Sequence, residues 1–397
     1  MFRRRGLLYA IPLLMDWALF LIVFAVSRRM ADTESGMLEM GLVGAILSSC
    51  HVVSSIVGGR LSDRIGRRRM MFCGSLSFVL CPLLAAWGWY GLTYAALGIG
   101  SGMMHPPIIA LLTEGRTHGR ARSAISHTLI VYCVSWNIGL ISGQMSGGWL
   151  YSHHEQLPLS AALVVGLIIT LCIALIRKPA ADGQLDTTIM DNDLKDHQDL
   201  AASFARLSRI SNVGGAVSMS MIVYLFPNLA VAMDIPPDEH GLIVSTTRLL
   251  VIAIYLIMHL SSFWHFRFSV ALTSQLIAMG GLVVLAHAEN RVTIWLALAA
   301  AVQLIGYNFF SSLYYSTAGS VESQRGASSG WHEASLAMGF AVGAALGGWI
   351  GEQRGVRAPY LLAAGVILVL AVVQIVVFTQ QVKWRRRPRG RRPESHA

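Results

Sequence analysis

Charge is scarce in this chain. Only 13% of its 397 residues are Asp, Glu, Lys or Arg, against 54% hydrophobic residues. A soluble protein of this length needs a charged surface, so the composition excludes an ordinary soluble protein and indicates an integral membrane protein. The five cysteines show no metal-ligand spacing, and their odd number argues against a disulfide framework. A nucleotide-binding G-x-x-x-x-G-K-[ST] loop is also missing, so we expect no ATP-driven work within the chain.

Long apolar segments fill most of the sequence. A helix that crosses a bilayer needs about 20 apolar residues, and twelve runs approach that length. They lie at 7–26, 37–59, 70–89, 92–113, 124–150, 157–176, 210–233, 241–263, 268–288, 293–317, 330–351 and 358–380. The sequence therefore predicts an all-α membrane protein with twelve transmembrane helices.

The positions of the cations predict how the chain is oriented. With the N-terminus inside, all but six of the 31 Lys and Arg fall in cytoplasmic segments. The six are Arg28, Arg29, Arg291, Arg354 and Arg357 on the outer side and Arg248 within a span. Cytoplasmic loops carry such an excess of Lys and Arg. We therefore expect a multi-pass protein of the plasma membrane (the inner membrane of a bacterium) with both termini cytoplasmic.

Four regions follow from this pattern: an N-terminal six-helix bundle at 1–176, a cytoplasmic linker at 177–209, a C-terminal bundle at 210–381 and a basic tail at 382–397. The linker carries six aspartates and then apolar residues at helical spacing. It is interpreted as a solvated linker with a short amphipathic helix on the membrane surface, or as a regulatory segment. The tail should lie against anionic lipids, and no nucleic-acid partner is expected.

The two predicted bundles share a repeat at an offset of 200 residues. Four glycines of the first half recur in the second: Gly139, Gly143, Gly147 and Gly148 as Gly339, Gly343, Gly347 and Gly348. Glycines four apart lie on one face of a helix and allow close approach of a neighbouring helix. The repeat predicts two pseudo-symmetric halves of six helices each.

A basic turn joins the second and third apolar segments. It reads Gly59-Arg60-Leu61-Ser62-Asp63-Arg64-Ile65-Gly66-Arg67-Arg68-Arg69. This pattern resembles the loop between helices 2 and 3 of the major facilitator superfamily. The resemblance implies a monomeric secondary transporter, not an enzyme, without cofactor or metal. It also implies that Gly59, Asp63, Arg64, Gly66, Arg67 and Arg68 form a conformational latch. We expect Asp63 to contact the start of the eleventh helix or Arg116.

Two further segments resemble motifs of the proton-coupled antiporters of that superfamily, each with a departure. Gly139-x-x-x-Gly143-Gln144-x-x-Gly147-Gly148 has Gln144 where the antiporter motif has proline, and simple helix packing explains it equally well. The glycine-rich run 97–102 resembles the helix 4 motif, but Tyr94 replaces its proton-relay arginine. If the chain couples to protons, Asp16, His105 or Glu333 must carry them.

Four ionisable residues within spans are candidates for substrate or proton binding, because such groups are costly in a bilayer. Asp16 could bind a cation or a proton, or make a structural hydrogen bond. His105 could shuttle protons or pack. Arg248 could pair with a carboxylate, bind an anionic substrate or extend to the outer interface. Glu333 could be a gate, a proton site or an interfacial carboxylate.

The superfamily resemblance also implies that helices 1, 4, 7 and 10 line a central cavity. The residues that this adds are Trp17, Met103, Met104, Tyr224, Asn228, Gln303, Tyr307, Asn308 and Tyr314. About half of them should face other helices, because periodicity gives faces and not depths. His51 and His259 are expected to be packing residues.

The predicted function is transport of a small solute by alternating access, coupled to an ion and most simply to protons. Efflux of an amphipathic compound and uptake of a small polar or anionic solute both stay open. A non-transporting membrane receptor or scaffold is the alternative of another class. A membrane enzyme would need a cluster of ligand-type or catalytic residues, whereas the polar residues here are scattered over different spans.

Overall fold

The computed structural model describes residues 2–113, 121–175, 192–318 and 325–380. Twelve helices and no strand occur in these ranges. They are α1 (Phe2–Asp32), α2 (Met37–Ile65), α3 (Arg67–Ala86), α4 (Tyr90–Thr113), α5 (Ala121–His153), α6 (Leu157–Leu175), α7 (Asn192–Ala232), α8 (Pro237–Leu260), α9 (Phe268–His287), α10 (Arg291–Ala318), α11 (Arg325–Arg354) and α12 (Ala358–Phe378). The twelve apolar segments thus correspond to twelve helices, as predicted.

Most of these helices have the length and composition of membrane spans. In the described residues, eleven are long and apolar enough to cross a bilayer. The helix that falls short is α5, because Asn137, Gln144 and several serines lower its hydropathy. Many large apolar side chains are exposed on the outer surface of the bundle, such as Leu368 and Val369 of α12, which are 50% and 62% exposed. Such a surface suits lipid rather than water.

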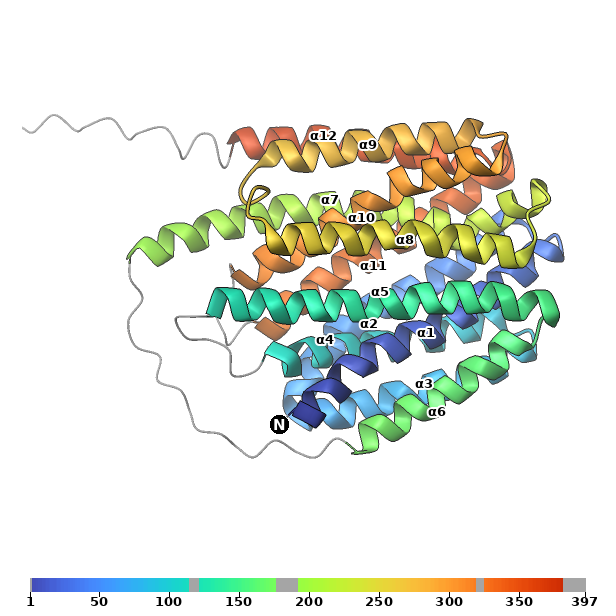
Figure 1. The fold of residues 1–397 in the computed structure, drawn as a ribbon, viewed down its shortest axis with the longest axis horizontal. Coiled ribbons are helices and arrows are strands. Elements are labelled where there is room, and N and C mark those ends of the chain that lie inside the picture. Colours follow the sequence, from blue (N-terminus) through green and yellow to red (C-terminus); the bar gives the residue numbers. More distant parts are fainter. Residues whose placement is uncertain (1, 114–120, 176–191, 319–324, 381–397) are drawn as a thin grey trace, which may run out of the picture.

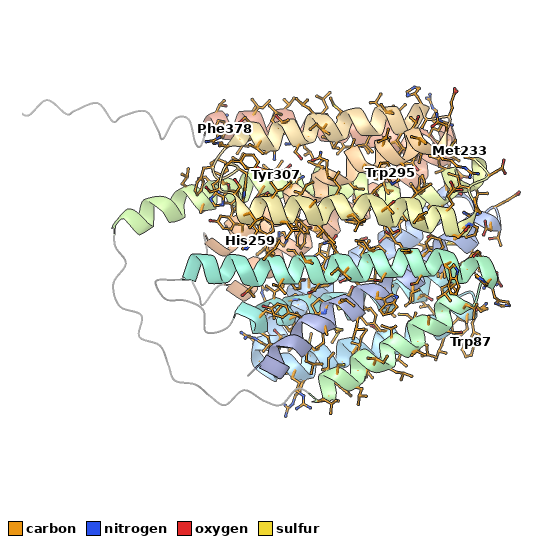
Figure 2. The ribbon with its side chains drawn as sticks, in the orientation of Figure 1. Trp87, Met233, His259, Trp295, Tyr307 and Phe378 are labelled. Carbon is orange, nitrogen blue, oxygen red and sulfur yellow. The ribbon has the colours of Figure 1, made fainter. Side chains whose placement is uncertain are left out.

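The first helix of each half, α1 or α7, begins at the same end of the bundle (Figure 1). We call the end where α1 begins and α12 ends the terminal end, and the opposite end the far end. Figure 2 shows His259 and Phe378 toward the terminal end, and Trp87 and Met233 toward the far end. Every helix crosses the bundle once, so the even number of helices returns the chain to the end where it started.

The start of α7 differs from the expected linker. The helix begins at Asn192, well ahead of the predicted start at 210, and continues without a break to Ala232. The ring of Phe204 packs against Phe266, Tyr315 and Phe378, with centroid distances of 5.3, 5.4 and 6.4 Å. The apolar face that predicted a separate surface helix is therefore covered by protein, and this segment is the first part of α7. Residues 177–191 lie outside the described part of the chain.

The glycine repeat lies where helices of the same half pack most closely. A Cβ on Gly139 would lie 2.9 Å from the carbonyl carbon of Leu13 in α1. A Cβ on Gly339, its counterpart in the second half, would lie 2.6 Å from the Cβ of Ala216 in α7. Only glycine permits this approach, so the repeated residues place α5 on α1 and α11 on α7.

The two halves meet through α2 against α11 and α5 against α8. Near the far end both pairs touch backbone to backbone. A Cβ on Gly41 would lie 2.8 Å from the Cα of Gly348, and one on Gly148 would lie 3.0 Å from the Cα of Gly241. These contacts hold the far ends of the halves together.

Polar contacts reinforce the closure of the far end. Arg28 of α1 donates a hydrogen bond to the carbonyl oxygen of Ile235, which precedes α8, at 3.0 Å, and pairs with Asp32 at 2.9 Å. The carboxylate of Glu352 at the end of α11 accepts a hydrogen bond from the backbone of Leu38 in α2 at 3.3 Å. Both interhalf bonds join residues from the same end of the bundle.

Candidate functional site

A cavity lies between the two halves, at the middle of the bundle. It contains about 860 Å³ of space free of protein atoms, part of it open to solvent. Eight helices contribute to its wall: α1, α2, α4 and α5 from the first half and α7, α8, α10 and α11 from the second. Most of its lining is apolar or aromatic. The ionisable residues among its lining are Asp16, His51, His105, Tyr132, Tyr224, Arg248 and Glu333.

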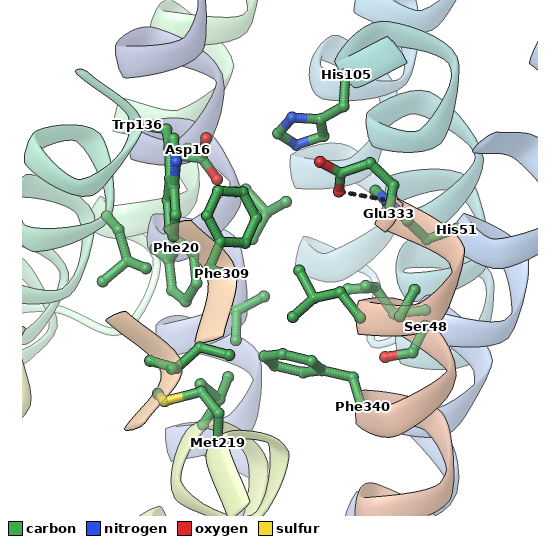
Figure 3. Close-up of a pocket in the computed structure, with 18 of the residues that line it drawn as sticks. Asp16, Phe20, Ser48, His51, His105, Trp136, Met219, Phe309, Glu333 and Phe340 are labelled. Atoms are coloured by element: carbon green, nitrogen blue, oxygen red, sulfur yellow. Dashed lines mark ion pairs between the residues drawn. The ribbon is translucent and has the colours of Figure 1, made fainter. Parts of the chain in front are cut away.

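An ion pair crosses the cavity from one half to the other. Glu333 of α11 lies 3.9 Å from Nε2 of His51 in α2, and the Glu333 side chain is buried (Figure 3). The other ring nitrogen of His51 shares a hydrogen bond of 2.8 Å with the hydroxyl of Ser101 in α4. This bond orients the ring toward Glu333. The second oxygen of Glu333 is buried and has no hydrogen-bond partner within the described ranges, so it can still accept a hydrogen bond.

His105 stands next to this pair. Its ring lies 5.7 Å from the ring of His51, and its Nδ1 shares a hydrogen bond of 3.0 Å with the hydroxyl of Tyr132 in α5. Two histidines from adjacent helices therefore face the same carboxylate region, as Figure 3 shows. Histidine is the side chain whose ordinary pKa lies nearest neutrality.

Asp16 enters the cavity from α1, on the other side from Glu333 (Figure 3). Its side chain is 5% exposed, and its Oδ2 atom is buried without a hydrogen-bond partner among the residues that the structure describes. It interacts electrostatically with Glu333 and with Arg248. The structure therefore places two carboxyl groups from opposite halves in one cavity.

Arg248 brings a cation into the same cavity. It lies near the middle of α8 and is only 2% exposed, so it does not extend to the outer interface. Neither a hydrogen bond nor an ion pair joins its guanidinium to any residue that the structure describes. Its electrostatic partners are Asp16 and Tyr255. Four ionisable residues that the sequence singled out separately (Asp16, His105, Arg248 and Glu333) thus line one site.

The residues added from the superfamily resemblance are placed less uniformly. Tyr224 lines the central cavity. Tyr307 and Asn308 line a smaller cavity inside the second half. The others contact neighbouring helices or loops: Trp17 bonds Ser146 of α5, Met103 and Met104 pack against Gly74 of α3, Asn228 contacts Met40 of α2, Gln303 bonds Ser274 of α9, and Tyr314 stacks on His265.

Several cavity residues were missed, some because they lie outside helices 1, 4, 7 and 10, and others, such as Phe309, because periodicity does not give their depth. Trp136 of α5 and Phe309 of α10 meet across the halves with ring centroids 5.2 Å apart. His51, expected to be a packing residue, lines the cavity from α2. The available signal for His51 was a lone ionisable group within an apolar span, which is costly unless it is paired or hydrated.

The basic turn between α2 and α3 is partly described. Gly66 adopts a φ of +98°, which favours glycine, and separates the two helices. Arg68 donates hydrogen bonds to the carbonyl oxygens of Ile173 and Ala174 in the last turn of α6, as cations at a helix C-terminus commonly do. The side chain of Asp63 and the whole of Arg116 lie outside the described part, so the contact expected for Asp63 stays a prediction.

Comparison with known proteins gives the family of the chain. The model of the Major Facilitator Superfamily matches residues 7–203 and 210–396, nearly the whole sequence in two blocks. The chain belongs to the Major Facilitator Superfamily. Members of this family are transporters and not enzymes, in agreement with the expectation from the sequence. In the described residues, no group of three or more His, Cys, Asp or Glu is placed to hold a metal ion.

Among curated relatives, the probable polyol transporter 6 of Arabidopsis thaliana is 26% identical over 185 residues, which are 43% of this chain and 34% of that protein. The cis,cis-muconate transport protein of Acinetobacter baylyi is 25% identical over 179 residues, which are 43% and 42% of the two chains. The matched region thus spans less than half the length of each of these superfamily relatives.

Solved structures share the fold over nearly the whole chain. The nucleoside transporter NupG matches with a TM-score of 0.69 and 15% identity, over 94% of this chain and 99% of that one. The human organic anion transporter MFSD10 (TETRAN) matches with a TM-score of 0.65 and 15% identity over the same shares. At this identity the likeness concerns the major facilitator fold alone.

Proposed function

We propose that this chain is a proton-coupled secondary transporter that moves a small solute by alternating access. The observation that carries the proposal is the pair of buried carboxyl groups, Asp16 and Glu333, that face one cavity from opposite halves. A buried carboxyl group binds or releases a proton when its surroundings change. Movement of the halves would change the surroundings of both groups together, which links proton binding to the side on which the cavity opens.

The close contacts at the far end suggest which side the cavity faces. Gly41 against Gly348 and Gly148 against Gly241 close the far end. The distribution of Lys and Arg favours a cytoplasmic location for the terminal end. We therefore infer an inward-facing conformation of a plasma-membrane transporter with both termini in the cytoplasm. In the outward-facing conformation, the latch residues around Asp63 would hold the cytoplasmic ends of the halves together.

Two solute classes agree with different parts of the lining. The aromatic side chains of the cavity favour an amphipathic compound, which efflux would remove from the cell. Arg248 favours uptake of an anionic solute, and one relative in the family is named as a cis,cis-muconate transport protein.

The proposal is tested by solute flux in proteoliposomes under an imposed pH gradient. The probes are labelled compounds of matched shape and different charge: benzoate, benzamide and benzylamine, and hexanoate, hexanamide and hexylamine. We expect at least one probe to move against its own gradient, and a protonophore to abolish that movement. If every flux ignored both the pH gradient and the protonophore, proton coupling would be wrong.

A further inference from the structure

Arg248 is a buried cation with no partner at bonding distance in the described part of the chain. It is 2% exposed, lines the central cavity, and makes no hydrogen bond or ion pair with the part of the chain that the structure describes. A guanidinium has five N–H donors in a planar fork that matches a carboxylate. Burial of such a group is costly unless an anion accepts its hydrogen bonds. An anion that accepts these hydrogen bonds would stabilise the buried guanidinium.

Neither carboxylate of the cavity serves as the anion for Arg248. Glu333 is paired with His51 at 3.9 Å. Asp16 interacts with Arg248 electrostatically, but the two side chains form no ion pair within 4.0 Å. Arg248 and Asp16 also belong to opposite halves, so their separation changes whenever the halves move. An anion bound to Arg248 would be held by the second half and would lie opposite Asp16 of the first half.

The rest of the lining limits the kind of anion. Rings from both halves form the wall around the polar groups: Phe20, Trp136, Phe309 and Phe340. A second charge on the solute would lose its hydration against these rings without a second buried arginine to replace it. An apolar body of the size of a benzene ring or a short alkyl chain would fill the space and bury apolar surface.

Charge balance then connects the anion to a proton. A carboxylate bound to Arg248 adds one negative charge to the cavity. A proton taken up by Asp16 would cancel that charge. The titratable or charged groups that share the cavity with Asp16 are His51, His105, Tyr132, Tyr224, Arg248 and Glu333. Of the two carboxyl groups among these, Asp16 forms no ion pair with a described residue, and its Oδ2 accepts no hydrogen bond from one.

We propose that the cavity binds an amphipathic monocarboxylate on Arg248 together with one proton on Asp16, so that solute and proton cross in the same direction without net charge. This inference rests on the proposed transport function and names its substrate class. Arg248 is the anion-binding residue, and Asp16 is the proton-binding residue. Protonated Asp16 no longer attracts Arg248 electrostatically. The guanidinium is then free to bind the carboxylate of the solute.

Equilibrium binding to the purified full chain in detergent tests the proposal. The probes are labelled benzoate and hexanoate, each compared with its amide and amine. For the wild type we expect the better-bound carboxylate to bind at least tenfold more tightly than its amide, since a charge-assisted hydrogen bond is lost in the amide. Arg248→Gln should abolish this preference and Arg248→Lys should keep part of it. Arg291→Gln, which changes an exposed arginine, should have no effect.

Proton uptake during binding tests the role of Asp16. In weakly buffered solution we expect about one proton taken up per carboxylate bound. Asp16→Asn mimics the protonated residue, so it should retain binding, lose proton uptake and make binding independent of pH. Melting temperatures of the variants separate loss of a contact from loss of the fold.

Three results would overturn the proposal. The first is that no carboxylate binds better than its amide. The second is that the amines bind best. The third is that proton uptake persists in Asp16→Asn but disappears in Glu333→Gln. If an amine or an amide moved in the proteoliposomes under proton control, this inference would fail while the proposed proton-coupled transport would stand.

Discussion

A single methyl group at the far end should change the balance between conformations. A Cβ on Gly41 would lie 2.8 Å from the Cα of Gly348 and even closer to the carbonyl oxygen of Ala344. Both neighbours are backbone atoms of α11, so neither can move aside as a flexible side chain does. In a conformation with the far ends apart, the same methyl group would meet nothing in α11. Gly41→Ala should therefore destabilise only the conformation described above.

The magnitude follows from the cost of overpacking. An added group in a close-packed contact typically costs about 1–3 kcal/mol. A free-energy difference of that size between two conformations changes their population ratio about 5- to 150-fold. Alanine also favours the helix by about 1 kcal/mol over glycine, but this gain is equal in both conformations and cancels.

Distances between spin labels at the far end measure the shift. Labels at His154, between α5 and α6, and at Glu289, between α9 and α10, report the separation of the halves, and both positions are exposed. We expect a longer distance to dominate in Gly41→Ala. The matched control is Gly365→Ala in α12, where a Cβ would have no atom within 4 Å. If Gly41→Ala and the control both gave the wild-type distances, the far-end glycines would not control the conformation.

Other substitutions give smaller or local effects. Arg28→Gln removes the hydrogen bond between the halves to the carbonyl of Ile235, which is worth about 1.5 kcal/mol. The same labels should show the population ratio shifted about tenfold toward the longer distance. An unchanged distance distribution would contradict this. His51→Ala leaves Glu333 buried and unpaired, which should cost about 3 kcal/mol of stability and lower the melting temperature. Adding Glu333→Gln should restore most of the lost stability. If it did not, the broken pair would not be the cause of the loss. Trp264→Ala should cost about 3–5 kcal/mol, because this fully buried ring donates a 2.7 Å hydrogen bond to the end of α8; a melting temperature equal to that of the wild type would refute this.

The helices and the repeat could be predicted from sequence because their signals are local. A bilayer requires a run of apolar residues of fixed length, and the glycines of α5 and α11 recur at one offset. The start of α7 could not be predicted, because the partner of Phe204 is an aromatic cluster formed by Phe266, Tyr315 and Phe378 from distant parts of the chain. An apolar helix face looks the same whether lipid or protein covers it.

The candidate site shows the same limit. Asp16 and Glu333 could be selected singly, since a carboxyl group in an apolar span is expensive, but their presence in one cavity depends on how the halves pack. Helical periodicity does not say which face of α4 or α10 turns inward. Met103 and Gln303 therefore lay on the expected helices and yet face α3 and α9 in the structure.

The central claim, that Asp16 couples transport to protons, is tested most directly by comparing net flux with exchange in the same proteoliposomes. With a transported probe of the panel, Asp16→Asn should lose accumulation driven by a pH gradient and keep exchange of labelled for unlabelled probe, because exchange needs no proton release. Asp238→Asn, at an exposed position in the first turn of α8, should retain both activities. Gradient-driven accumulation in Asp16→Asn equal to that of the wild type would contradict the claim.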